Sequence, residues 1–416
     1  MKAKGSFQLA ARTLGSFAQL AKDALDERAG RALPITQEQV ARPEVVNDLL
    51  DRFAPGGRRV LPEVKAVRLP GVDFESSNCI NFLIEVDFET PAESAEEALP
   101  KTIYVKIPCA ERGTRSFAHT LGFWSLETAF CAQAAQAVPI RIPRVYAAAE
   151  QGARFVLLLE NLHETPGMEL FINRDMAAGT TVDRAERVLT TFAELHAHFW
   201  DWPEADRDAL LPAALNTYLA PRSREMTRAL NASALSPALR AAPDLLSPEL
   251  GETYRRAIKK WDALLDYWYT GPLTLVHGDS HLGNCFEYPA EGAKDLQGDG
   301  GGTRVGMIDF QAAHWSKGIR DVQYFLINSL DPELLAQNED RLIRFYCDAL
   351  AQHDISLTPE TAFEQYRAFS FQTLVVGVVP LGLSNLTERN ETVRAITRRS
   401  AAAIERLGFR EWLDAL

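Results

Sequence analysis

Two short apolar segments of this 416-residue sequence each end in an aspartate, and an asparagine lies between them. The first segment, Leu273 to Val276, leads into His277-Gly278-Asp279, and Asn284 follows five residues after that aspartate. The second, Val305 to Ile308, ends at Asp309. Short apolar runs of this kind predict strands, so two strand ends deliver two carboxylates and an amide to one region of the fold.

These oxygen-bearing side chains are suited to Mg²⁺ bound to a nucleotide phosphate. Mg²⁺ takes oxygen ligands and keeps several waters, so one or two carboxylates and an amide oxygen are enough when phosphates supply the rest. We predict that Asn284 and Asp309 are the metal ligands. Phosphoryl transfer also needs a group that orients the acceptor hydroxyl and takes its proton. We predict that Asp279 is this general base.

The combined pattern resembles the aminoglycoside phosphotransferase and choline kinase superfamily, the small-molecule relatives of protein kinases. His277-Gly278-Asp279 with Asn284 stands where protein kinases have HRD and its asparagine, and Ile308-Asp309-Phe310 stands where they have DFG. The resemblance covers about residues 60–350. It implies an α+β, two-lobed protein-kinase-like fold, in which an antiparallel sheet with one helix forms the N-lobe and a larger, mostly helical part forms the C-lobe. It also implies ATP and Mg²⁺ as cofactors and a small-molecule hydroxyl as acceptor.

Lys106 lies near the end of a predicted strand, 102–107, that is otherwise mostly apolar. A buried ammonium must be paired, and kinases pair it with the α/β-phosphates and with a glutamate of the next helix. The predicted helix 113–137 carries Glu127, so we predict a Lys106–Glu127 pair. Glu111 is the alternative partner, but it precedes that helix. A lysine that extends into solvent is the alternative role for Lys106.

The loop 71–78 joins two predicted strands, 64–69 and 76–88, and in the kinase fold this loop covers the phosphates. Here it lacks the GxGxxG pattern, so the hydroxyls of Ser76 and Ser77 are the predicted phosphate contacts, with an ordinary tight turn as the alternative.

Two more strands are predicted at 142–149 and 154–162, and the second resembles the segment that links the lobes and binds the adenine edge. Glu160, Asn161 and Leu162 are its predicted hinge positions, through their backbone groups. A core strand followed by a turn is the alternative. The predicted divisions are a helical extension at 1–58, an N-lobe at 59–162 and a C-lobe at 163–416.

Helical periodicity predicts the remaining elements. Helices at 6–29 and 43–53, the second after a capping signal at Thr36, are expected to pack on the N-lobe. A helix at 183–200, capped by Asp183, carries His196 and His198, which point apart and suit a structural role better than zinc. Helices are also predicted at 339–350, 360–377 and 391–407.

The segment 201–270 is predicted to be helical, interrupted at Pro203, Pro212, Pro221 and Pro237, and to hold the acceptor. Five of the seven tryptophans fall between residues 200 and 315, where they either contact the acceptor or form core. Asp321 is expected to cap a helix that begins at Val322 and, by the resemblance, to accept hydrogen bonds from the catalytic-loop backbone.

Composition narrows the function. A formal charge of −12 argues against nucleic acid as a partner, and no apolar run approaches a membrane span. Five cysteines without CxxC pairing predict a reducing compartment, and we expect a cytoplasmic protein. The alternatives to a general small-molecule kinase are an antibiotic-resistance kinase and a nucleotide-binding regulatory module without catalysis. GTP in place of ATP and the oligomeric state stay open.

Overall fold

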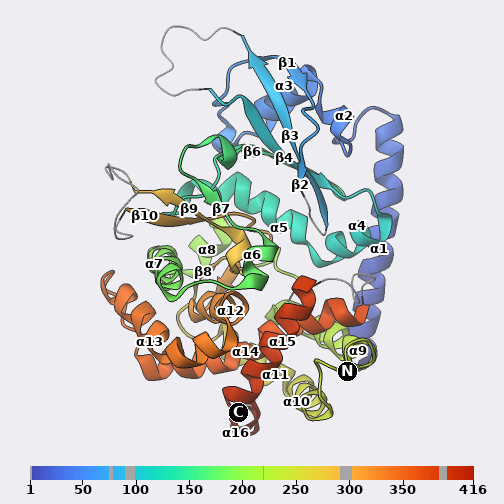
Figure 1. The fold of residues 1–416 in the computed structure, drawn as a ribbon. Helices are drawn as coiled ribbons and strands as arrows, with labels where there is room; N and C mark the ends of the chain where they lie inside the picture. Colours follow the sequence, from blue (N-terminus) through green and yellow to red (C-terminus); the bar gives the residue numbers. More distant parts are fainter. Residues whose placement is uncertain (1, 75–77, 90–98, 219, 291–301, 384–390) are drawn as a thin grey trace.

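A computed structural model describes residues 2–74, 78–89, 99–218, 220–290, 302–383 and 391–416. Figure 1 shows a sheet with a few helices in the upper part and a mostly helical lower part. This is the predicted α+β, kinase-like architecture, which is therefore confirmed.

The upper sheet is antiparallel, with strand order β1-β3-β4-β6-β5 and β2 paired to the outer part of β3. Its strands are β1 (Val64–Arg68), β2 (Asp73–Phe74), β3 (Cys79–Phe88), β4 (Thr102–Pro108), β5 (Val145–Gln151) and β6 (Arg154–Glu160). Successive side chains of β4 point to opposite faces of the sheet. Ile103, Val105 and Ile107 point into a core that they share with α3 (Pro43–Arg52). Tyr104 and Lys106 therefore face the opposite side, toward the lower part.

A helix that carries Glu127 covers that opposite side, but it is not the single helix predicted over 113–137. It is α4 (Arg112–Leu121), α5 (Phe123–Ala129), a π-helical turn (Phe130–Ala134) and a 3₁₀ turn (Ala135–Ala137). The break falls at Gly122, which has a φ of 74°. A Cβ atom there would lie 3.2 Å from Leu215 O, and Thr217 Oγ1 donates a hydrogen bond to Leu121 O. The helix is therefore broken where a segment of the lower part docks against it.

The N-terminal helix α1 (Lys2–Arg28) contacts both parts of the molecule rather than the N-lobe alone, which corrects one prediction. It packs against α4 above and against α9 (Arg224–Ala241) below. Figure 1 shows it along the side of the molecule, bridging the two. Thr36 caps the short α2 (Gln37–Val40) and not α3, which begins after Arg42 without a side-chain cap.

The lower part contains most of the helices and two small sheets. The helices are α6 (Asn173–Ala178), α7 (Val182–His198), α8 (Glu204–Leu210), α9, α10 (Pro248–Lys259), α11 (Trp261–Tyr269), α12 (Ile319–Ser329), α13 (Pro332–Ala351), α14 (Pro359–Leu383), α15 (Glu391–Arg406) and α16 (Phe409–Ala415). The strands are β7 (Glu169–Leu170), β9 (Cys285–Pro289) and β10 (Thr303–Met307) in one sheet, and β8 (Thr274–Val276) and β11 (His314–Ser316) in the other.

Three details differ from the sequence predictions. Thr181, not Asp183, caps α7, because its side chain accepts from the Arg184 backbone N–H. Pro237 lies inside α9 and does not end it, since the helix continues along its packing surface on α14. Helix α12 begins at Ile319, so Asp321 lies within its first turn and does not cap it.

Helix α14 is the one described helix that is long and apolar enough to cross a membrane by length and composition. Of its most apolar window, 72% is buried inside the protein, as in the core helix of a folded domain. The tryptophans also mostly form core: Trp261 and Trp268 are fully buried, and Trp315 is 6% exposed.

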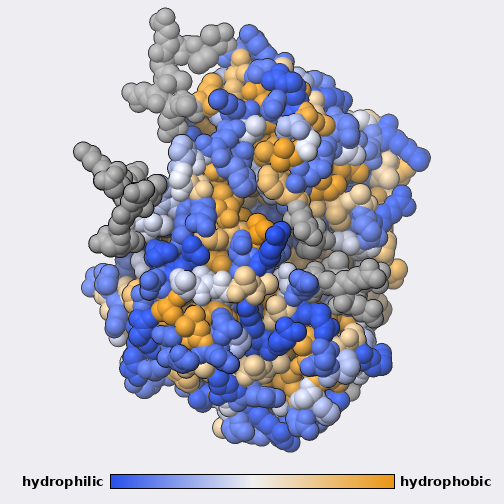
Figure 2. Space-filling model, in the orientation of Figure 1, coloured by the Kyte–Doolittle hydropathy of each residue, from blue (hydrophilic) through white to orange (hydrophobic). Residues whose placement is uncertain are grey.

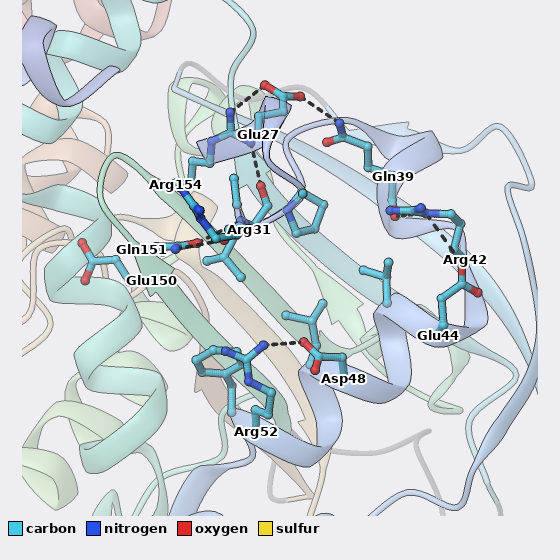
Figure 3. A pocket seen from close by; sticks show the side chains of 17 residues that line it. Glu27, Arg31, Gln39, Arg42, Glu44, Asp48, Arg52, Glu150, Gln151 and Arg154 are labelled. Atoms are coloured by element: carbon cyan, nitrogen blue, oxygen red, sulfur yellow. Dashed lines mark hydrogen bonds and ion pairs between the residues drawn. The ribbon is translucent and has the colours of Figure 1, made fainter. Parts of the chain in front are cut away.

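A cavity of about 590 Å³ lies between the end of α1 with residues 30–34, helix α3 and the turn from β5 to β6, and none of the predicted site residues lines it (Figure 3). Its walls carry Arg31, Arg42, Arg52 and Arg154, and the first three are paired with nearby carboxylates. Arg154 is paired with Glu27. These four arginines are therefore neutralised locally by neighbouring carboxylates.

Candidate active site

The loop after β8 is shaped by a glycine. Gly278 has a φ of 84°, and a Cβ atom there would lie 1.9 Å from the backbone oxygen of Ala312. Only glycine meets both conditions, which explains why the residue after His277 has no side chain. The half-buried carboxylate of Asp279 comes next and faces a pocket between the two parts of the molecule.

Asp321 holds this loop from α12. Its Oδ2 accepts from the backbone N–H of His277 at 2.6 Å, and its Oδ1 accepts from that of Gly278 at 3.0 Å. His196 Nε2 lies 3.3 Å from Oδ2, and His196 Nδ1 lies 2.8 Å from the Tyr346 hydroxyl. Burial would raise the pKa of Asp321, but the His196 hydrogen bond and nearby positive charge outweigh it and lower this pKa well below its ordinary value. The predicted contact with the catalytic-loop backbone is present.

His277 joins the two aspartate-bearing segments. Its Nδ1 accepts from the Asp279 backbone N–H at 3.2 Å, so its Nε2 carries the hydrogen that is donated to Ile308 O at 2.8 Å. Burial lowers the pKa of His277, which keeps this neutral form. Asn284 adds a second tie, because its Nδ2 donates to Asp279 O at 2.8 Å.

Asp279 stays ionised in this setting. Burial alone would raise its pKa, but the rings of His281 and His277 and the hydroxyl of Tyr324 outweigh that effect. The pKa of Asp279 therefore lies below its ordinary value. A carboxylate in this state can accept a hydrogen bond from an acceptor hydroxyl, although it is a weak base until the hydroxyl develops negative charge in the transition state.

Lys106 and Glu127 form a buried ion pair. Lys106 Nζ donates to Glu127 Oε1 at 2.7 Å and to Asp309 Oδ1 at 3.1 Å. Burial raises the pKa of Glu127 to about 7, and Asp309 adds to the rise while Lys106 opposes it. The two carboxylates in turn outweigh burial and raise the pKa of Lys106. Glu111 is engaged elsewhere, as the N-cap of α4.

Phe310 connects the helical segment that carries Glu127 to the catalytic loop. Its ring stacks on Phe130 at 4.0 Å between centroids, and it lies 4.4 Å from the ring of His277. Because Phe130 follows Glu127 by three residues, a shift of α5 would be transmitted to the residue next to Asp309. These two ring contacts explain why an aromatic residue follows Asp309 in the Ile308-Asp309-Phe310 segment.

Asn284 directly precedes β9 and Asp309 follows β10, so the two residues lie at the open end of this hairpin. The Ile308 backbone N–H donates to Asn284 O there, at 2.9 Å. Lys106 occupies one oxygen of Asp309, and Asn284 uses its amide nitrogen on Asp279, so Asp309 Oδ2 and Asn284 Oδ1 are left as ligand atoms. Asp309 has a φ of 64°, an uncommon conformation that often marks a functional residue. Within the described part of the chain, no group of three or more His, Cys, Asp or Glu could hold a metal. These residues fit Mg²⁺ that arrives with phosphate oxygens and water.

The structure shows which polar groups of the predicted hinge are already bonded within the protein. The Glu160 carboxylate accepts hydrogen bonds from the Arg141 side chain and from the Arg144 backbone N–H. Leu162 O accepts a hydrogen bond from the Thr165 backbone N–H. The Leu162 N–H has no hydrogen-bond partner among the described residues and is free to meet a base. Ser76 and Ser77 lie outside the described residues.

Three aromatic side chains beside the hinge were not predicted. Phe74 of β2 lies 5.2 Å from Tyr104 and stacks on His163 at 5.7 Å between ring centroids. Side chains two positions apart in a strand point to the same face of a sheet. The sequence therefore indicates that Tyr104 lies on the same face as Lys106. These rings give a flat base a surface on which to stack.

The pocket that Asp279 faces has a volume of about 150 Å³ and mostly apolar walls. Side chains of Leu121, Phe123 and Leu126 come from α4 and α5, whereas Leu215, Tyr218 and Val376 come from the lower part. Arg320 and His314 are the basic residues and Asp279 is the one acidic residue among its described lining residues. A second pocket, of about 370 Å³, shares Leu126, Asn216 and His314 with it and leads to Tyr269 and Trp315. Figure 2 shows this face of the molecule hollowed between its upper and lower parts.

The fold and the arrangement of Lys106, Glu127, Asp279, Asn284 and Asp309 define the class of protein-kinase-like small-molecule kinases. The model of one family in this class, the ecdysteroid kinase-like family, matches residues 82–358. The chain belongs to that family.

Solved structures to which this chain is similar include a choline kinase from Cryptosporidium parvum, 12% identical, where the match covers 90% of this chain and 100% of that one with a TM-score of 0.47. A putative aminoglycoside phosphotransferase from Ralstonia eutropha is 11% identical over 88% of this chain and 98% of its own, with a TM-score of 0.45. A GDP complex of aminoglycoside 2'-phosphotransferase-IIIa is 14% identical over 82% and 93%, with a TM-score of 0.44. A search of curated proteins finds no significant match.

Proposed function

We propose that this protein transfers the γ-phosphoryl group of ATP to a hydroxyl group of a small, largely apolar alcohol. One observation carries the proposal: the Asp279 carboxylate stands between the Asn284–Asp309 pair and an apolar pocket. An acceptor hydroxyl in that pocket would meet a proton acceptor on the side that faces the nucleotide phosphates.

Each residue has a role in this proposal. Lys106 orients the α/β-phosphates while Glu127 fixes its position, and Asn284 and Asp309 would hold Mg²⁺. Bound there, Mg²⁺ neutralises phosphate charge as the transfer proceeds. Asp279 aligns the acceptor hydroxyl and takes up its proton. Positioning and electrostatic stabilisation supply most of the rate in such sites.

The pocket walls indicate the class of acceptor. A polycationic aminoglycoside needs several carboxylates, and the described lining of this pocket has only Asp279. Aliphatic and aromatic walls instead favour an apolar alcohol, and the family name suggests a hydroxylated steroid as the first compound to try. We place the reaction in the cytoplasm, where ATP is abundant and the free cysteines stay reduced.

The test combines a thermal shift with a turnover assay. ATP, GTP and ADP, each with and without Mg²⁺, are titrated into wild type, Asp279→Asn and Asp309→Ala, because a ligand of the folded state raises the melting temperature. ADP release is then measured with a hydroxylated steroid, choline and kanamycin. We expect a Mg²⁺-dependent shift in wild type and Asp279→Asn but not in Asp309→Ala, and turnover in wild type alone. Turnover by Asp279→Asn comparable to wild type would refute its role as base, and a nucleotide shift without turnover on any alcohol would favour a regulatory module.

A further inference from the structure

A crevice of about 400 Å³ lies between α1, the first half of α4 and Arg154 of β6. Figure 1 shows α4 meeting α1 at the side of the molecule, where the two helices pack together. None of the predicted site residues lines this crevice, so it is separate from the proposed active site. Its volume falls within the range of small-molecule sites, roughly 300–1,000 Å³.

One wall of the crevice is apolar and belongs to α1. It consists of Phe17, Leu20, Ala21, Ala24 and Leu25, which lie on one face of the helix because they are three or four positions apart. Phe17 is 48% exposed and Leu25 is 63% exposed, so the described part of the chain covers them only in part. An apolar chain laid along this wall would remove both side chains from water.

The rest of the lining is charged, and arginines outnumber carboxylates there. Its described members are Arg28, Arg112, Arg115, Arg154 and Glu27. Glu27 is already held by Arg154, at 2.7 Å. Neither Arg28 nor Arg112 forms an ion pair with a carboxylate in the described ranges. The crevice therefore carries an excess of positive charge beside its apolar wall.

Arg115 has the strongest unmet requirement for a partner. Its side chain is only 8% exposed, yet it forms no ion pair with a described carboxylate. Its Nη2 donates to Ala153 O at a long 3.4 Å, and its Nε has no hydrogen-bond partner. A buried guanidinium normally has an anionic partner, because removing its charge from water is costly.

The acidic residues near Arg115 are engaged elsewhere. Asp23 accepts the Ala153 backbone N–H at 2.9 Å, and Glu27 is bound to Arg154. Burial lowers the pKa of Arg115 and the charge of Arg154 adds to the decrease, which Asp23 and Glu27 only partly oppose. The chain thus leaves a place for an anion from outside.

We propose that this crevice binds a free single-chain carboxylate, with its carboxylate group on Arg115 and its chain along the apolar wall of α1. A carboxylate can accept two parallel hydrogen bonds from a guanidinium and supplies the partner that Arg115 lacks. Arg28 and Arg112 add to the positive charge of the site.

The volume sets the size of the ligand. A methylene group is close in size to a water molecule, which fills about 30 Å³ of the liquid, so the crevice has room for a chain of on the order of ten carbons. A membrane lipid carries two chains, each longer than that. One free carboxylate therefore fits better than a lipid.

The first test is calorimetric titration of the full chain with sodium decanoate, below the concentration at which it forms micelles. We expect one decanoate per chain and a higher melting temperature. 1-Decanol keeps the chain without the charge, and acetate keeps the charge without the chain. Each should bind at least about tenfold more weakly than decanoate, because each loses one of the two sets of contacts. Equal binding of decanol or of acetate, or no binding of decanoate, overturns the proposal.

The charged side is tested with Arg115→Gln. This variant should bind decanoate at least about tenfold more weakly without a lower melting temperature in the absence of ligand, since it removes a buried charge that has no partner. Arg12→Gln is the matched control, because Arg12 of α1 also donates to a backbone oxygen, Thr120 O, and does not line the crevice. It should bind like wild type. Decanoate binding that is unchanged in Arg115→Gln would belong to another site, such as the acceptor pocket, and would overturn the proposal.

The apolar wall has its own matched pair of variants. Phe17→Ser should weaken decanoate binding, whereas Leu14→Ser should not, because Leu14 is also exposed on α1, at 69%, but does not line the crevice. An equal loss in both variants, or no loss in either, contradicts the proposed path of the chain. Cosedimentation of wild type with phosphatidylcholine–phosphatidylserine vesicles, lost equally in both variants, would assign this face of α1 to a membrane surface and overturn the proposal.

Discussion

We expect Asp321→Asn to lower turnover strongly while nucleotide binding persists, because Asp321 orients the loop that carries Asp279. Its carboxylate accepts backbone hydrogen bonds at 2.6 and 3.0 Å, and His196 lies 3.3 Å away. An asparagine keeps one acceptor oxygen, so its NH₂ group must face a backbone N–H that it cannot bond. One end of the loop is therefore released.

The magnitude follows from these contacts. A buried hydrogen bond to a charged group contributes about 1.5–3 kcal/mol, and the opposed donors add to the loss, so the free energy of unfolding should fall by roughly 3 kcal/mol. For a chain of this length that corresponds to a melting temperature about 5 °C lower. A displacement of Asp279 by ~1 Å should reduce kcat by about 100-fold.

The assay is ADP release with the best acceptor, beside the thermal shift given by ADP and Mg²⁺. Asp23→Asn is the matched control, because Asp23 is also a buried aspartate that accepts a backbone N–H, at 2.9 Å, but lies outside the site. The control should lose stability and keep kcat. If Asp321→Asn loses as much stability as Asp23→Asn but keeps kcat within twofold of wild type, the positioning argument is wrong.

Three further predictions address the glycine, the ion pair and pH. Gly278→Ala should cost more than about 1 kcal/mol of stability and most of the turnover, whereas Gly57→Ala, which has a similar φ but open space around it, should cost only the backbone strain. Lys106→Met should remove the nucleotide-induced shift and destabilise the fold by about 3–5 kcal/mol, since it leaves Glu127 buried without its cation; an unchanged shift would contradict the role of Lys106. Burial lowers the pKa of His314 to about 4, so below pH 6.5 the unfolded chain binds a proton that the folded chain does not. Stability should therefore fall by up to ~3 kcal/mol from pH 6.5 to 4, and His314→Gln should show a smaller fall in melting temperature over that range.

The parts of the site that lie close together in the sequence could be predicted. Asp279 follows β8, Asn284 precedes β9 and Asp309 follows β10, so all three lie at strand ends within one short stretch of the chain, residues 279–309. Lys106 and Glu127 could also be predicted, because a charged residue in an apolar strand needs a partner and the next helix offers one. The structure brings these five residues together, and the experiments above test what they do.

The walls of the proposed acceptor pocket could be predicted only in part: residues 215–218 lie in the segment 201–270 that was expected to hold the acceptor, but the packing of distant segments around them could not be predicted. Residues 215–218 show no pattern of their own, and they matter because they dock at the break after Leu121. The break between α4 and α5 also could not be predicted. Gly122 lies in an otherwise helical sequence, and a glycine in such a sequence does not always end a helix. The position of α1 across both parts of the molecule was missed for the same reason as the pocket, because its contacts with α4 and α9 join segments that are far apart in the sequence.

The pocket also shows why a division of the chain at residue 162 does not divide its function. Leu121, Phe123 and Leu126 belong to the upper part, and Leu215 and Val376 belong to the lower part, so the acceptor would touch both at once. Lys106 above and Asp309 below are in contact at 3.1 Å, and Asn78 Nδ2 donates to Gln311 Oε1 at the same distance. Helix α1 packs on both parts as well. If the proposed roles hold, a substitution that separates the two parts should therefore weaken nucleotide and acceptor binding together.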